Sequence, residues 1–185
     1  MDKKCSICNE KCTDYGNRYL RDGIVCRNCV KFASPWLSDD DYKRRDIEDF
    51  KEHLKYRELN KEKLESFEPE NVVKGKYTLY LDKDNRQFVI SKRKDYKKDN
   101  ADVLNYDDIQ KLTIYDSKDD TGNYNIYVNI DLNFEEIDNV CFRVNEFPGL
   151  ERDSDEYNDA LKKAYEYLGA LEDEEGKDFE EVDNG

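Results

Sequence analysis

The chain has 185 residues, of which 37% are apolar and 41% are charged, and its formal net charge is −14. Globular domains average about 45–50% apolar and about 25% charged residues, so this composition argues against one large hydrophobic core. The acidic balance also argues against nucleic acid or an anionic membrane as the default partner.

The charge is unevenly distributed along the chain. Residues 1–35 have a net charge of +3 and residues 76–100 have +4, whereas residues 101–150 have −8 and residues 151–185 have −10. The first residues lack the apolar stretch of a secretory signal, and no run approaches the ~20 apolar residues that span a bilayer. We therefore expect a cytoplasmic protein without a transmembrane segment, in which cysteines stay reduced.

The strongest motif is a pair of Cys-x2-Cys sequences formed by Cys5, Cys8, Cys26 and Cys29. Between them, Asp22-Gly23 predicts a hairpin turn that brings the second pair back toward the first. In a reducing compartment this spacing indicates a tetrahedral zinc site with four thiolate ligands. Such a site is closed, so we predict one structural Zn²⁺ and no metal-bound water. Disulfides, a redox pair and an iron site are the alternative interpretations.

The other chemically reactive side chains have simpler interpretations. Cys12 is expected to be a free, partly buried thiol, although service as a substitute ligand for Cys8 stays open. Cys141 is expected to be a packing residue, and Asn9 to take the left-handed backbone conformation that asparagine tolerates. His53, the single histidine, lies among charged residues and is interpreted as a solvated helix residue. Without a partner for His53 or a glycine-rich phosphate loop, we predict no enzymatic activity.

Residues 36–70 are predicted to form a helical connector. Ser38 is a good N-cap, and Asp41 occupies the position of a capping-box acid. The step from Leu54 to Leu59 interrupts the apolar stripe, so one long helix and two short helices are both compatible with the pattern.

Residues 71–171 are predicted to form an antiparallel β domain closed by a helix. Apolar residues alternate with polar ones around residues 77–81, 88–90, 104–114, 124–132 and 140–144. Short strands at this spacing favour a small barrel or sandwich. Ser154 caps the final helix, whose predicted buried face comprises Tyr157, Leu161, Ala164, Tyr165, Leu168 and Leu171. Residues 172–185 hold eight acidic residues and one lysine, and we expect a disordered acidic tail.

A basic run from Lys92 to Lys98 follows one of the predicted strands. We interpret it as a solvated loop that balances nearby acids, and binding of phosphate headgroups or nucleic acid is the alternative. The acidic surface is interpreted mainly as solubilising. Its alternative role is imitation of the phosphate charge of DNA.

Several segments together resemble a bacterial zinc-ribbon family of unknown function, typical of Firmicutes and their mobile elements: the cysteine pairs, the stretch Leu20–Cys29 and the helix Ile47–Glu58. The match gives Cys5, Cys8, Cys26 and Cys29 as metal ligands, and Asn9 stands where the family usually has glycine. The resemblance implies a following domain similar to the pleckstrin-homology fold, a curled seven-strand barrel capped by a C-terminal helix. Such folds usually bind peptides, proteins or lipid headgroups.

The predicted fold is therefore of the α+β class: a zinc ribbon (1–35), a helical connector (36–70), a pleckstrin-homology-like β domain (71–171) and the tail (172–185). Our leading hypothesis is a non-enzymatic adaptor that binds another protein. An acidic phage- or plasmid-type inhibitor of a host nucleic-acid or defence enzyme is the first alternative. Weak nucleic-acid or lipid-headgroup binding through the ribbon and the basic run is the second.

Overall fold

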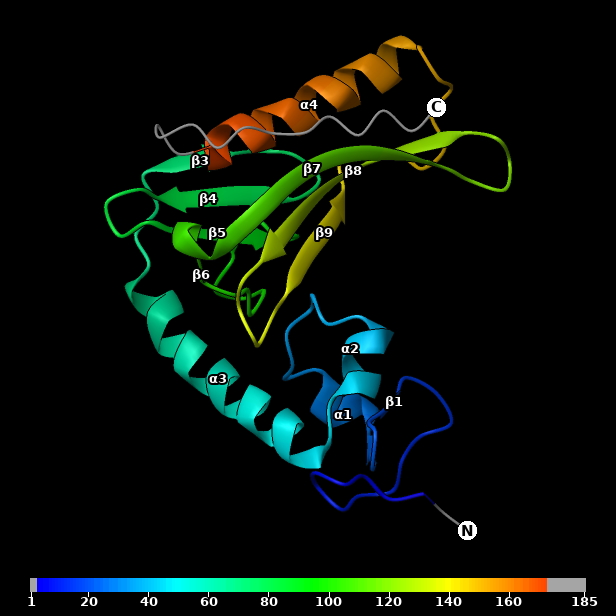
Figure 1. The fold of residues 1–185 in the computed structure, drawn as a ribbon, viewed down its shortest axis with the longest axis vertical. Helices are drawn as coiled ribbons and strands as arrows, with labels where there is room; N and C mark the ends of the chain where they lie inside the picture. Colours follow the sequence, from blue (N-terminus) through cyan, green and yellow to red (C-terminus); the bar gives the residue numbers. More distant parts are fainter. Residues whose placement is uncertain (1–2, 173–185) are drawn as a thin grey trace. The chain divides into compact units, whose positions relative to one another are not determined.

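The computed structural model describes residues 3–172, and the chain divides into two compact units, Met1–Ser66 and Phe67–Gly185 (Figure 1). Helices and antiparallel sheets are both present, which confirms the α+β class. Apart from Glu172, the predicted acidic tail lies outside the described residues. Within residues 3–172, every helix is too short or too polar to cross a membrane.

The first unit begins with the cysteine-bearing module. Strands β1 (Arg18–Tyr19) and β2 (Ile24–Val25) pair antiparallel, and the short helix α1 (Arg27–Val30) follows. The backbone N–H of Leu20 donates to the carbonyl oxygen of Gly23 at 2.9 Å, which closes the predicted turn.

Two helices complete this unit, α2 (Asp39–Arg44) and α3 (Ile47–Ser66). The predicted capping box is confirmed, because the Ser38 hydroxyl accepts from the Asp41 N–H and the Asp41 carboxylate accepts from the Ser38 N–H. The helices are separated at Arg45–Asp46, whereas α3 runs without interruption past the gap in its apolar stripe.

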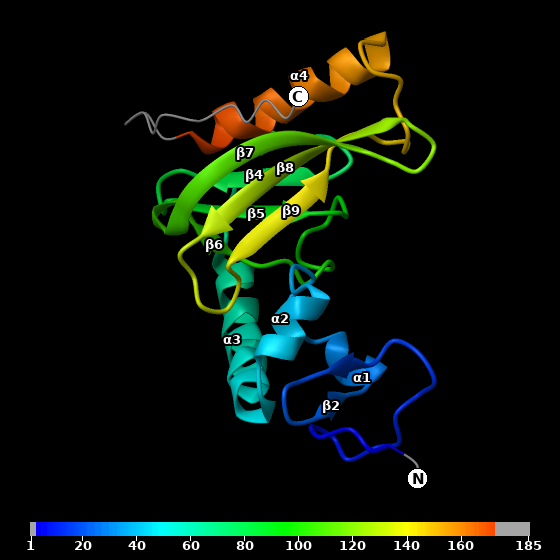
Figure 2. The ribbon, with the colours of Figure 1, turned by 45° about the vertical axis from the view of Figure 1, so that its right-hand side comes forward.

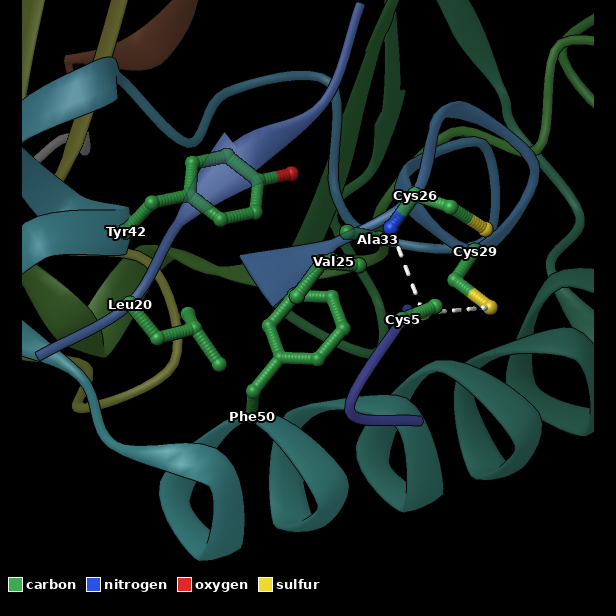
Figure 3. Close-up of a cluster of buried hydrophobic side chains, with 8 residues drawn as sticks. All are labelled: Cys5, Leu20, Val25, Cys26, Cys29, Ala33, Tyr42 and Phe50. Atoms are coloured by element: carbon green, nitrogen blue, oxygen red, sulfur yellow. Dashed lines mark hydrogen bonds between the residues drawn. The ribbon is translucent and has the colours of Figure 1, made fainter. Parts of the chain in front are cut away.

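A small core holds the first unit together (Figure 3). Tyr42 of α2 and Phe50 of α3 meet with ring centres 5.7 Å apart. The buried members of this core are Cys5, Leu20, Val25, Cys26, Cys29, Ala33, Tyr42 and Phe50. Three of the eight are cysteines of the paired motifs, so the core and the candidate metal site share side chains.

The interpretation of His53 as a solvated residue is wrong. Its side chain is fully buried at 0% exposure, and Nε2 accepts a hydrogen bond from the Ser34 N–H at 3.1 Å. Arg57 and Asn60 are buried on the same helix. Positions 53, 57 and 60 share one face of α3 because they are separated by about one and two turns. The charged sequence neighbours of His53 therefore point elsewhere.

The second unit contains two antiparallel sheets (Figure 2). The first sheet has the order β3-β4-β5-β6, with β3 (Asn71–Val73), β4 (Thr78–Asp82), β5 (Gln87–Ser91) and β6 (Leu104–Asn105). After a 3-10 turn, the second sheet has the order β7-β8-β9, with β7 (Ile109–Lys118), β8 (Tyr124–Leu132) and β9 (Asn139–Arg143). The predicted strands are present, but the described residues of the second unit form two sheets without a closed barrel.

Every residue of β4 is buried, although its alternating sequence predicts one exposed face. Tyr80 of this strand packs against Tyr96 with ring centres 4.7 Å apart, and Phe67 contacts Tyr96 in turn. Tyr96 and Phe67 lie outside the strands of this sheet. The sequence of β4 alone therefore does not show that both of its faces are buried.

Helix α4 (Asp155–Leu171) packs against the second sheet, mainly against β8. The predicted Ser154 cap is confirmed, since its hydroxyl accepts from the Tyr157 N–H at 3.2 Å. One predicted core residue is wrong, because Tyr165 is 46% exposed. Tyr167 is buried instead, at 1% exposure, and its hydroxyl donates to the carbonyl oxygen of Tyr77.

Candidate metal centre

Two tight turns position the four cysteines. Cys5 and Cys8 flank a turn that Asn9 ends with φ of 61°, the left-handed conformation predicted for it. Cys26 directly precedes α1, and Cys29 lies within this helix. The hairpin of β1 and β2 separates the two pairs along the chain and returns the second pair to the first.

The structure brings the four sulfur atoms together, all within 4.8 Å of one another. Sγ of Cys5 lies 3.9 Å from Sγ of Cys29, and Sγ of Cys8 lies 3.7 Å from Sγ of Cys26. A tetrahedral ion with metal–sulfur bonds of about 2.3 Å separates its ligands by about 3.8 Å. The cluster therefore fits one tetrahedral ion.

Backbone amides support Cys5 at the centre of the cluster. Its sulfur accepts hydrogen bonds from the N–H groups of Cys26 at 3.2 Å and Ile7 at 3.4 Å. Figure 3 shows the first of these contacts, with Cys5, Cys26 and Cys29 converging. No sequence motif indicates these amide donors, because they depend on the geometry of the turn. They stabilise a thiolate, the form of cysteine that binds metal.

The electrostatics of the cluster favour a cation. Burial raises the pKa of the Cys5 thiol, but the amide donors outweigh burial and lower this pKa to about 6. At Cys29, burial and hydrogen bonds to the neighbouring thiols raise the pKa above its ordinary value. One thiolate thus forms readily while another resists ionisation beside it. A divalent cation removes this conflict, because it stabilises all four thiolates at once.

The four ligand candidates differ in their access to solvent. Cys5, Cys26 and Cys29 are buried, whereas Cys8 is exposed. Cys8 therefore lies on the solvent side of the cluster, while its three partners belong to the core of the unit.

The two remaining cysteines lie apart from the cluster. Cys12 is partly buried against the core of the first unit, and burial together with the charge of Cys5 raises the pKa of its thiol. Cys141 is half-buried on β9, with its sulfur 3.3 Å from the hydroxyl of Tyr115.

The basic run from Lys92 to Lys98 is an ordered loop at the end of β5. A carboxylate oxygen of Asp99 accepts hydrogen bonds from the Ser91 hydroxyl at 2.7 Å and the Lys92 N–H at 2.9 Å. Ion pairs join Arg93 to Asp99 at 3.5 Å and Lys98 to Asp95 at 3.2 Å. The loop therefore balances nearby acids, as the sequence interpretation holds.

Comparison with known proteins concerns the N-terminal part of the chain. Residues 3–53 match the model of a family described as a domain of unknown function (DUF4428). No curated protein and no solved structure matches the chain. The matched segment includes all four clustered cysteines, so the chain has an N-terminal DUF4428 domain with a four-cysteine candidate metal site.

Proposed function

We propose that the chain is a non-enzymatic protein-interaction adaptor whose first unit is stabilised by one structural Zn²⁺. The main observation in support is the cluster of Cys5, Cys8, Cys26 and Cys29. Four thiolates fill the tetrahedral coordination of zinc, so no position remains for a reactive water. In so small a unit, zinc would contribute folding free energy on the order of 10 kcal/mol.

Exposed aromatic side chains support the interaction role. Tyr15 and Tyr19 are 67% and 55% exposed. The guanidinium of Arg27 lies 5.0 Å from the ring centre of Tyr15, and the ammonium of Lys3 lies 5.1 Å from that of Tyr19. Tyrosine and arginine are enriched where proteins bind one another. The single histidine, His53, hydrogen-bonds inside the first unit, which supports a non-enzymatic role.

The second unit supports the same class of protein. Its four-stranded sheet, three-stranded sheet and final helix follow one another in the order of a pleckstrin-homology fold. We therefore propose this fold type for residues 71–171, while the fold alone does not decide the partner. A site of four clustered thiolates requires reduced cysteines, so we propose a reducing, cytoplasmic setting.

Metal analysis and affinity purification test the proposal. We expect one zinc per purified chain; iron or no metal would contradict the metal assignment. A partner captured from lysate by the wild type should be lost by a Tyr15→Ser/Tyr19→Ser variant that retains its metal. The control Tyr165→Ser, at an exposed tyrosine of α4, should keep that partner. Turnover by the purified protein that one substitution abolishes would overturn the non-enzymatic role.

A further inference from the structure

Two lysines stand at the same end of the first sheet of the second unit. Strands β4 and β5 pair antiparallel, with Thr78 opposite Ser91 at the end of the ladder. Lys92 follows Ser91 directly, and Lys76 lies two residues before Thr78. The strand register therefore brings Lys76 and Lys92 near each other, although they come from different loops. Lys92 is exposed and Lys76 is partly buried.

A third cation reaches this end from the second sheet. The rings of Tyr77 and Phe142 lie with their centres 5.2 Å apart. Lys76 precedes Tyr77 and Arg143 follows Phe142, so this aromatic contact brings the two cations together. Three segments far apart in the sequence thus place three basic side chains around one contact between the sheets.

The electrostatics agree with this placement. Burial lowers the pKa of Lys76, and the positive charges of Arg143 and Lys92 lower it further. Glu146 acts in the opposite direction, and Asp99 is a second acid beside the cluster, because its carboxylate accepts the Lys92 N–H at 2.9 Å. Within residues 3–172, no ion pair joins Lys76, Lys92 or Arg143 to a carboxylate. Three cations gathered without an ion pair to either acid are unfavourable, and such arrangements are characteristic of binding sites.

The guanidinium of Arg143 has one N–H donor without a hydrogen-bond acceptor in this cluster. Its Nη2 donates to the carbonyl oxygen of Glu146 at 3.4 Å. Its Nε is buried and has no hydrogen-bond partner among the described residues. A buried donor without a partner is costly, and an anion seated against the guanidinium would satisfy it.

We propose that Lys76, Lys92 and Arg143 form a binding site for a phosphate group, presented by a soluble phosphate ester or by a lipid headgroup. A guanidinium offers two parallel N–H donors that match the oxygen spacing of phosphate. The two ammonium groups add point charges that suit a dianion. This site lies in the second unit and goes beyond the proposed zinc-stabilised adaptor function.

Titration of the full, metal-loaded chain with inorganic phosphate at constant ionic strength tests the site. The Nε–Hε signal of Arg143 should shift saturably in nuclear magnetic resonance spectra. The apparent affinity should fall at least tenfold in Arg143→Gln and in Lys76→Gln/Lys92→Gln. Lys83→Gln, the same charge change at the opposite end of β4, should leave the affinity unchanged. Absence of a saturable shift, or an equal loss in Lys83→Gln, would overturn the proposal.

A vesicle experiment distinguishes the two sources of phosphate. Phosphatidylcholine vesicles with and without phosphatidic acid are sedimented with the wild type and with Lys76→Gln/Lys92→Gln, which changes side chains that are not fully buried. Binding only to the phosphatidic acid vesicles, lost in the variant, assigns a lipid headgroup. Phosphate binding without vesicle binding assigns a soluble phosphate ester. Phosphate and vesicle binding retained in the folded double variant would refute the site.

Discussion

Cys26 illustrates how one side chain belongs both to the core and to the candidate metal site of the first unit. It is 4% exposed, and its own N–H donates to the sulfur of Cys5. We predict that Cys26→Ser abolishes the proposed zinc binding and unfolds the first unit, since structural zinc contributes on the order of 10 kcal/mol to the folding of small domains. Zinc content and the amide spectrum of the chain measure the two effects.

The matched control for this substitution is Cys12→Ser. Cys12 lies outside the cluster of four sulfur atoms, so this variant should retain one zinc per chain and the wild-type spectrum. A Cys26→Ser protein that keeps its zinc would contradict the assignment of the ligands. Loss of zinc in the Cys12→Ser protein would show that Cys12 takes part in coordination.

His53 shows where inference from individual residues stops. Four cysteines in two pairs identify a candidate site because thiolate chemistry and short spacing are both visible in the sequence. In its buried position, His53 accepts a hydrogen bond from the N–H of Ser34, which lies 19 residues away along the chain. A hydrophilic sequence neighbourhood suggests exposure, yet the helix face decides the environment. The prediction that Tyr165 is buried is wrong for the same reason, since the orientation of α4 about its axis decides that Tyr167, which the predicted face does not include, is buried instead.

At the scale of elements, local signals predict caps better than boundaries. The Ser38–Asp41 capping box was visible in the sequence. An equivalent reciprocal pair, Asp46 and Asp49, starts α3 through two hydrogen bonds of 2.9 Å, and the apolar pattern does not predict it. This pair marks the start of α3, directly after the end of α2. The capping residues therefore indicate the helix boundary better than the apolar stripe does. The two-sheet division and the aromatic cover of β4 depend on contacts distant in sequence.

The turn between β1 and β2 requires glycine because of a close approach. A Cβ atom at Gly23 would lie 2.5 Å from the Ser6 hydroxyl and 2.9 Å from the side chain of Ile47. We predict that Gly23→Ala destabilises the first unit by about 1–3 kcal/mol through overpacking. It should also weaken zinc binding, because Ser6 lies between the first two cysteines. Denaturant titration and competition with a zinc chelator measure these effects.

Gly169 provides the control for that substitution. It lies within α4, and an added Cβ would have no neighbour within 4 Å. Gly169→Ala should therefore stabilise the second unit by about 0.5–1 kcal/mol, the helix-propensity gain of alanine over glycine. Unchanged stability of the first unit in Gly23→Ala would contradict the close approach.

A side-chain hydrogen bond from a tyrosine joins α4 to the second sheet. The hydroxyl of Tyr157 donates to a carboxylate oxygen of Asp116 on β7 at 2.6 Å. Burial, together with this carboxylate, raises the pKa of Tyr157 to about 12. A raised tyrosine pKa means that its stability contribution is fully present below the unfolded value of about 10. The contribution is then lost as the pH rises toward 12.

We therefore predict that Tyr157→Phe destabilises the second unit by about 1–3 kcal/mol at neutral pH, since it removes a hydrogen bond to the charged, partly buried carboxylate of Asp116. The difference from the wild type should shrink between pH 10 and 12. Urea unfolding at pH 8, 10 and 11 measures this dependence. Tyr165→Phe, at the exposed tyrosine of the same helix, should follow the wild type throughout. A constant difference across these pH values would refute the role of the hydroxyl.

At the scale of the whole molecule, the two units have different sources of stability. The first unit has a core of eight buried side chains that includes three of the clustered cysteines. The second unit has its own core, formed by two sheets and α4, and Cys141 is its single cysteine. Its strands include five buried residues in β4 alone. Metal removal should therefore act on one unit and spare the other.

We predict that a strong chelator at pH 7 unfolds the first unit while the second keeps its native fold. The physical reason is that four unligated thiols cannot replace the bonding that zinc supplies, whereas burial of the strands of the second unit needs no metal. Amide spectra should lose dispersion for residues 3–66 and keep it for residues 67–172. Added zinc should restore the lost signals, and magnesium should not, since it prefers oxygen ligands. Collapse of both sets of signals would show that the second unit depends on the first, and an unchanged spectrum after complete zinc removal would contradict a structural role for the metal.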